Sequence, residues 1–152
     1  MSPIKHIAVS APLGIAVAVV TQSTLAGMLC FFSGFLIDID HLVEYTMYYG
    51  FGDFRFKSIY AACAKMANRE EEGGVKRIFF FLHTAEIAIL LWVGYFFSKN
   101  IYFLAIALGY SGHLIMDGTA NAISPWAYFI TSRIKNGFRT ASFVRTKSRS
   151  KT

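Results

Sequence analysis

The stretch that decides the fold is an apolar run ending in a polar tetrapeptide, LAGMLCFFSGFLI-DIDH, at residues 25–41. The run Leu25–Ile37 carries no charge, whereas Asp38, Asp40 and His41 follow it at once. A helix that merely ended here would need one capping or polar residue, yet this tetrapeptide supplies three side chains that are common ligands of divalent metals. We therefore expect a hydrophobic helix with a polar site at its end.

The composition of the whole chain indicates an all-α, multi-pass membrane protein. Of its 152 residues, 55% are hydrophobic and only 16% are charged, which is more apolar than soluble domains usually are. Apolar runs predict a bundle of four transmembrane helices at about residues 6–22, 24–42, 78–97 and 101–117. The uncharged runs 7–20 and 25–37 within the first two helices are shorter than the ~20 residues that a spanning helix needs, so the polar residues beside them would lie at membrane depth or at the interface.

The remaining segments are predicted to be a loop and a tail. A short amphipathic helix is expected at residues 59–68, inside the charged and glycine-containing cytoplasmic loop between the second and third spans. The membrane domain is expected to comprise residues 1–132, and residues 133–152 a disordered cytoplasmic tail with seven of the fifteen basic residues and no acid. Because these residues follow a membrane segment, we expect them to bind anionic lipid headgroups rather than nucleic acid.

The distribution of Lys and Arg predicts the orientation of the four helices. Fourteen of the fifteen basic residues fall before the first helix, between the second and third, or after the fourth, and Lys99 alone falls on the other side. A different number of spans would scatter these charges over both faces. Since cytoplasmic loops carry the excess of Lys and Arg, we expect an inner-membrane protein with both termini in the cytoplasm.

The same topology brings the four histidines of the chain to one side of the membrane. His6 begins the first helix, His41 ends the second, and His83 lies a turn or so into the third. His113 lies in the last turn of the fourth helix. All four are therefore expected at the cytoplasmic end of the bundle.

Acidic residues accompany these histidines at helical spacing, which places each pair on one helix face. The pairs are Asp38 with His41, His83 with Glu86, and His113 with Asp117. Taken singly, each residue also has a structural interpretation as a capping or packing group. Glu86 is the hardest to explain in that way, because an unpaired carboxylate inside an apolar span costs ~2.5 kcal/mol or more. We expect its partner to be His83 or a metal ion.

Four segments also carry a family resemblance: HIAVS from His6, Gly34 with DIDH, LHT from Leu82, and GYSGHLIMD from Gly109 with Thr119 and Pro125. They resemble the bacterial and archaeal membrane-bound metal-dependent hydrolases, which are also described as inner-membrane hydrolases that bind the SOS repressor. The resemblance covers most of residues 1–126. More faintly, the Asp-Ile and His-x-x-x-Asp blocks are similar to the zinc-dependent phospholipase C and single-strand nuclease fold, an all-helical enzyme with a His and Asp metal cluster.

The resemblance implies a set of metal ligands and a hydrolytic chemistry. The implied ligands are Asp38, His83, His113 and Asp117, with His6 and His41 in the same shell. Asp40 is then either a bridging ligand or a residue that orients a ligand. The expected cofactor is zinc, as one or more ions that lower the pKa of bound water to roughly 7, with Asp40 or Glu86 as the general base.

A site at the cytoplasmic interface suits an amphiphilic phosphoester, such as a phospholipid or a polyprenyl phosphoester, whose chains would stay in the bilayer. Two other functions are compatible with the sequence. A transporter or sensor of divalent cations or protons would need polar residues continuing toward Lys99, and few are present there. A non-catalytic membrane scaffold would recruit a cytoplasmic protein partner through its loop and tail, and would not need His41 or His113.

Overall fold

The computed structural model describes residues 3–50, 52, 55, 58, 61, 80–120, 124–139 and 142–143. Every regular element in this part of the chain is a helix, which confirms the all-α class. The amphipathic helix expected at 59–68 falls outside the described residues except at one position.

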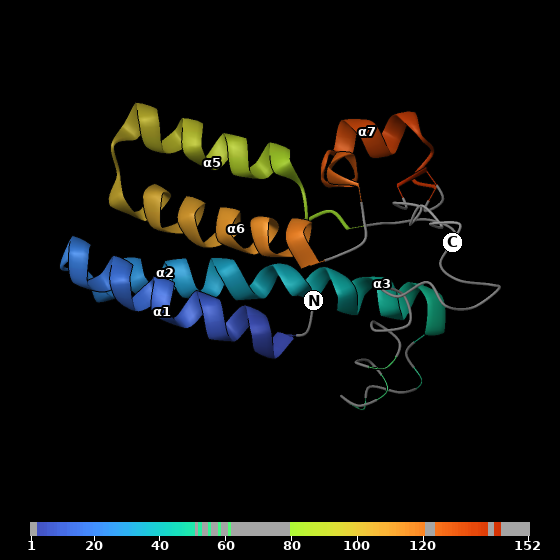
Figure 1. Ribbon diagram of the computed structural model, residues 1–152, viewed down its shortest axis with the longest axis horizontal. Coiled ribbons are helices and arrows are strands. Elements are labelled where there is room, and N and C mark those ends of the chain that lie inside the picture. Colours follow the sequence, from blue (N-terminus) through green and yellow to red (C-terminus); the bar gives the residue numbers. More distant parts are fainter. Residues whose placement is uncertain are drawn as a thin grey trace, which may run out of the picture.

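The first two helices form an antiparallel hairpin (Figure 1). Helix α1 covers Pro3–Thr21 and helix α2 covers Thr24–Phe35. Between them Gln22 adopts a left-handed conformation with φ 53°. The Ser23 hydroxyl then accepts a hydrogen bond from the Ala26 N–H at 3.2 Å, and such capping satisfies one of the free N–H groups at a helix start. The short uncharged connection at residues 21–24 therefore turns the chain back.

The polar tetrapeptide lies where the second helix changes its winding. Helix α2 passes into a 3-10 turn at Leu36–Asp38 and then into helix α3 at Ile39–Tyr49. The two α-helices follow one another along one path (Figure 1). The chain thus remains helical beyond residue 42, where the sequence predicted that the second helix would end. A 3-10 turn between two helical stretches often marks a functional hinge or local strain.

The second hairpin joins helix α5, Ala85–Ser98, to helix α6, Ile101–Ala120. Lys99 between them has φ 53°, and the Asn100 side chain accepts a hydrogen bond from the Tyr102 N–H at 2.8 Å. The third predicted span began at residue 78, but α5 begins at Ala85. Residues Phe80–Thr84, which we call the strap, are not helical.

Close packing of α1, α2 and α6 builds the centre of the bundle. A Cβ atom at Gly27 in α2 would lie 2.5 Å from the Cβ of Ala18 in α1, and one at Gly109 in α6 would collide with the Cys30 carbonyl oxygen of α2. The absence of side chains at these two positions therefore permits the helix backbones to approach closely. Helix α5 packs on the outer side of α6 (Figure 1), and none of its residues is buried.

The C-terminal elements lie beyond the end of the α5–α6 hairpin that carries the strap (Figure 1). They are a 3-10 turn at Pro125–Tyr128 and helix α7 at Ile130–Lys135. The sequence predicted a disordered tail from residue 133, but Arg133 is buried within α7, and Phe143 is buried further along. The ordered structure thus extends past the predicted boundary, because both side chains pack against the rest of the fold.

Three helical segments are long and apolar enough to cross a membrane: Ile4–Thr21, Thr24–Met47 and Ile101–Ala120. Helix α5 is apolar but shorter, with 14 residues. Large hydrophobic side chains are exposed on each hairpin, such as Val20 and Leu90. Exposed apolar surface of this kind is typical of helices that contact lipid, so the fold is consistent with a membrane protein.

Candidate metal centre

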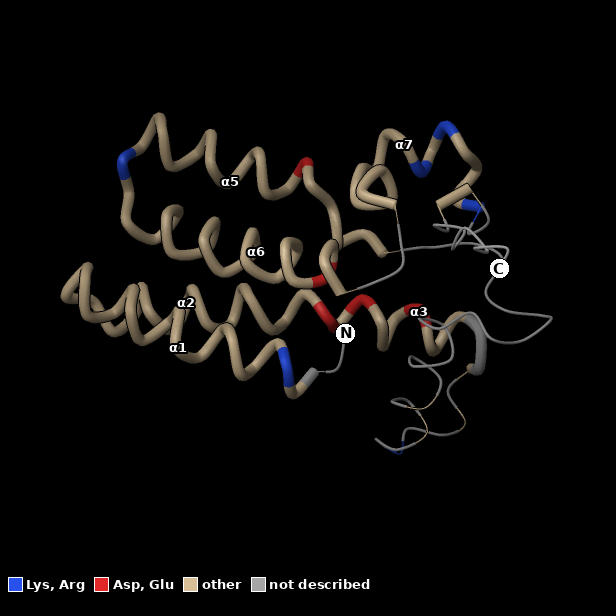
Figure 2. Tube along the Cα trace, viewed as in Figure 1, with Lys and Arg blue, Asp and Glu red and all other residues tan. Residues whose placement is uncertain are grey.

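The helices bring two overlapping groups of potential metal ligands together. One group is His6, Asp38, His113 and Asp117, and the other is Asp38, His41 and His83; within each group the ligand atoms lie within 4.8 Å of one another. These six are the residues that the sequence predicted as metal ligands. The acidic residues of the described chain are concentrated where α2, α3 and α6 approach the strap, away from the hairpin turns (Figure 2).

Local helix geometry explains two of the predicted pairs. In α6 the Nε2 atom of His113 lies 3.5 Å from Oδ2 of Asp117 at a spacing of four residues. At the start of α3 the Nε2 atom of His41 lies 3.7 Å from Oδ1 of Asp38 at a spacing of three. Both pairs therefore share a helix face as predicted.

Asp38 is the residue that the two groups have in common. Its Oδ1 atom lies 3.6 Å from Nε2 of both His83 and His113. Its Oδ2 atom lies 3.9 Å from Nε2 of His6. A carboxylate with two oxygens facing different histidines is able to serve two neighbouring ligand sets.

Contacts made by the other ring nitrogen orient two of the histidines. The Nδ1 atom of His83 lies 3.3 Å from Oδ2 of Asp40, and that of His113 lies 2.8 Å from the Gly34 carbonyl oxygen. Because a carbonyl oxygen only accepts hydrogen bonds, Nδ1 of His113 carries a proton, and in the neutral ring Nε2 is the unprotonated nitrogen. Partners of this kind fix the tautomer and orientation of metal-binding histidines. The two Nε2 atoms converge to 3.1 Å.

Asp40 therefore has the contacts of an orienting residue. Besides facing the His83 ring, its Oδ2 atom accepts hydrogen bonds from the backbone N–H groups of Leu82 and of His83, the latter at 3.2 Å. The sequence left open whether Asp40 bridges metals or orients a ligand. These three contacts on one oxygen favour the second interpretation.

The cluster is strongly anionic around His83, which lies on the strap and outside the apolar helices. Burial lowers the pKa of His83, but its interactions with Asp117, Asp38 and Asp40 outweigh burial and raise this pKa to about 10. Without a metal, the imidazole would therefore hold a proton at neutral pH. A metal ion binding at Nε2 would have to displace that proton.

Unsatisfied buried atoms test whether the cluster fits a metal ion. Both ring nitrogens of His6 and the Oδ2 atom of Asp38 are buried without a hydrogen-bond partner. His6 is fully buried, and its Nε2 atom lies 3.2 Å from Asp117 Oδ1. Buried polar atoms left in this way are costly. A divalent cation among these nitrogen and oxygen donors would satisfy them, so the residues fit such an ion.

Glu86 has a different partner from the one that the sequence predicted. Its carboxylate accepts hydrogen bonds from the Ile130 N–H at 3.0 Å and from the N–H and hydroxyl of Thr131, each at 3.1 Å. The expected partner was His83 or a metal, whereas the described contacts are with the start of α7.

Two residues of the site were missed by the sequence analysis. The Tyr110 hydroxyl contacts the backbone of Leu82 and Thr84, and the Arg133 guanidinium contacts the carbonyls of Phe80 and His83. Tyr110 lies three residues before His113, and this spacing was a usable signal because it places both on one face. No such signal existed for Arg133, which stands among the basic residues of the expected tail.

Comparisons with protein-family models, with curated proteins and with solved structures find no match to this chain.

Proposed function

We propose that the protein is a membrane-embedded, metal-dependent hydrolase that acts on the phosphoester of a lipid or another amphiphile. The observation that carries the proposal is the convergence of His6, Asp38, His113 and Asp117, whose ligand atoms lie within 4.8 Å of one another. They come from three separate helices, and buried charged groups are paired with one another or coordinate metals. The resemblance to the membrane-bound metal-dependent hydrolases is part of the proposal.

The membrane topology that we propose has four spans and both termini in the cytoplasm of an inner-membrane protein. Helix α5 is the short one, since its 14 residues rise only about 21 Å. Its hairpin partner α6 is long enough to cross the membrane. In this topology the turn at Lys99 lies on the side of the membrane opposite to the cytoplasm. The metal centre, the strap and α7 then lie together at the cytoplasmic interface, where the basic tail contacts anionic lipid headgroups.

Zinc is the metal that we propose, because imidazole and carboxylate donors are its usual ligands together with thiolates. His6, His113 and Asp117 would hold one ion, His41 and His83 a second, and Asp38 would contact both. An ion bound there supplies Lewis acidity and an activated water nucleophile. No serine or cysteine nucleophile is needed.

The protein's own residues orient the site and admit the substrate. Asp40 and the Gly34 carbonyl hold the rings of His83 and His113 with their Nε2 atoms facing each other. The side chains of His41 and Asp38 are the accessible ones, 24% and 13% exposed, whereas those of His6, His83, His113 and Asp117 are at most 3% exposed. A phosphoester headgroup would therefore approach from the side of His41 and Asp38.

Of the two residues considered as general base, neither has contacts that favour that role. Asp40 is committed to the strap, and Glu86 to the start of α7. We propose instead that Asp40 acts through His83, whose ring it orients.

The interior of the bundle supports a hydrolase over a transporter. Among the described residues away from the cluster, those buried between α1, α2 and α6 are apolar or glycine apart from Ser10, and include Val17, Ala26, Cys30 and Ala105. A path for a cation would need polar groups along it. The scaffold alternative differs in that a scaffold would not depend on the histidines.

The decisive experiment measures metal content and hydrolysis with the same samples. Detergent-purified wild type should contain stoichiometric zinc by elemental analysis and should release product from radiolabelled phospholipid or polyprenyl phosphate vesicles. His113→Ala should lose both, whereas Gly118→Ala in the same helix should lose neither, since a Cβ there meets nothing within 4 Å. Wild type without bound metal would refute the hydrolase proposal. Metal without hydrolysis would leave cation sensing as the better function.

A further inference from the structure

Arg133 is a buried charged residue that the proposed chemistry does not use. It is 1% exposed, although it lies on the short helix α7. One guanidinium nitrogen, Nη1, donates to the Phe80 carbonyl, and Nη2 donates to the His83 carbonyl at 3.1 Å. Both acceptors lie on the strap. A charge this buried is expensive unless it is hydrogen-bonded; Nη1 and Nη2 have partners on the strap, whereas Nε has no hydrogen-bond partner.

The strap depends on side chains from other elements for its hydrogen bonds. Asp40 of α3 accepts from two of its N–H groups, and Tyr110 of α6 contacts Leu82 and Thr84. Arg133 of α7 donates hydrogen bonds to two carbonyl groups of the strap, those of Phe80 and His83. A non-helical segment has no hydrogen-bond ladder of its own, so the strap is held by these partners and by the packing of Phe80 against Ala127 and Phe143.

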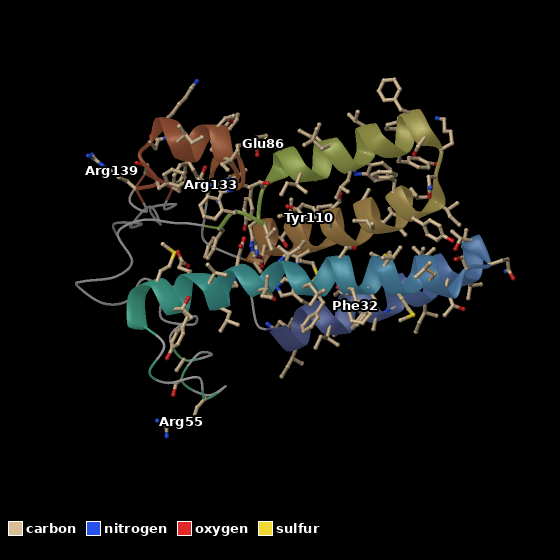
Figure 3. All side chains as sticks on the ribbon, turned by 180° about the vertical axis from the view of Figure 1, so that it is seen from behind. Phe32, Arg55, Glu86, Tyr110, Arg133 and Arg139 are labelled. Atoms are coloured by element: carbon tan, nitrogen blue, oxygen red, sulfur yellow. The ribbon has the colours of Figure 1, made fainter. Side chains whose placement is uncertain are left out.

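Helix α7 is itself tied to the element that follows the strap. Glu86, at the start of α5, accepts hydrogen bonds from Ile130 and Thr131 at the start of α7. The strap, Glu86, α7 and Arg133 thus form a closed set of contacts. Figure 3 shows Glu86 and Arg133 at the same end of the α5–α6 hairpin, with Tyr110 below them on α6.

We propose that Arg133 is a positioning residue that holds His83 in the metal centre, so that α7 is part of the metal-binding apparatus. The proposal rests on the metal centre described above. Arginine suits the task because its planar fork presents several N–H groups in fixed directions, whereas lysine offers a single flexible ammonium. Metal–ligand distances deviate by only about 0.2 Å from their usual values. A loosened strap would therefore weaken the bond between a metal ion and His83 Nε2.

The test uses Co²⁺ as a spectroscopic probe of the purified full-length protein. Arg133→Lys should weaken Co²⁺ binding about 10- to 100-fold, as loss of a residue that orients a ligand does. Its visible absorption bands should shift toward those of His83→Ala. The matched control is Lys135→Gln, an exposed position of the same helix, which should bind Co²⁺ as wild type does.

A double-mutant cycle separates positioning of His83 from a general loss of structure. If Arg133 acts through His83, adding Arg133→Lys to His83→Ala should change Co²⁺ affinity less than about 2-fold, because the two changes then remove one interaction. If the combined loss equals the product of the single losses, the proposal is overturned. Wild-type affinity and spectrum in Arg133→Lys would overturn it as well.

A second variant covers the case in which Arg133→Lys does not fold. Glu86→Ala retains the Arg133 side chain but removes the acceptor that fixes α7, and Glu86 itself is only half-buried. It should weaken Co²⁺ binding in the wild-type background and have no effect in His83→Ala; no weakening in the wild-type background overturns the proposal. Failure of wild type to bind Co²⁺ or zinc would instead refute the metal centre itself.

Discussion

Replacing Asp40 by Asn tests whether this carboxylate orients His83 or transfers protons. Its Oδ2 atom accepts from two backbone N–H groups of the strap and faces His83 Nδ1 at 3.3 Å. Asn keeps an oxygen for the N–H groups but loses the charge beside the imidazole. We expect metal affinity to fall about 10- to 100-fold, which corresponds to about 1.4 to 2.8 kcal/mol, with little change in helix content.

The assay is competition for zinc between the purified protein and a chromophoric chelator, with circular dichroism as the measure of folding. Asp40→Ala serves as the comparison, because it also removes the acceptor for the strap. Each N–H left unpaired should cost about 1 to 3 kcal/mol of stability. Asp40→Ala should therefore lower the thermal midpoint as well as the metal affinity, and Asp40→Asn mainly the affinity.

Two results would refute the reasoning. Unchanged zinc affinity in Asp40→Asn would show that the carboxylate does not support His83. Unchanged affinity with loss of hydrolysis would identify Asp40 as the general base. Thr46→Ala, on the same helix, should change neither property.

Three further predictions concern packing, pH and metal removal. Gly109→Ala should destabilise the protein by about 1 to 3 kcal/mol, because the new Cβ would collide with the Cys30 carbonyl oxygen. Gly118→Ala, whose Cβ meets nothing within 4 Å, should be neutral or stabilising. Thermal unfolding of the two variants measures the difference. In the metal-free protein the raised His83 pKa contributes stability that is present below pH 6.5 and lost as the pH rises through about 10; His83→Asn should flatten this part of the pH profile of unfolding. Chelation of the metal should lower the thermal midpoint, and zinc at 100 times its Kd should restore about 2.7 kcal/mol; a midpoint unaffected by chelator would contradict a bound ion.

Much of the candidate site could be predicted because helical spacing fixes which side chains share a face. Asp38 with His41 and His113 with Asp117 needed only this rule. The approach of His6 to Asp117 additionally required the charge-based topology, which placed the helix ends on one side. These residues lie in long apolar segments, where the periodicity is most reliable.

The strap and its partners could not be predicted for a physical reason. Phe80, Phe81 and Leu82 are apolar and continue into α5, so local composition favoured one helix from residue 78. The non-helical path of the strap depends on Asp40, Tyr110 and Arg133, which are distant from it in the sequence. The predicted partner of Glu86 was wrong for the same reason, since its hydrogen-bond donor at the start of α7 lies 44 residues away along the chain.

The contact of Arg133 with the strap has a consequence for biogenesis. Helix α7 follows the other helices of the described chain in the sequence, so the strap can acquire the Arg133 donors only after residue 133 has been synthesised. Translation that stops before residue 133 would leave the Phe80 and His83 carbonyls without these partners. Assembly of the proposed metal centre would thus depend on synthesis of the chain as far as Arg133, well beyond the residues that would bind the metal.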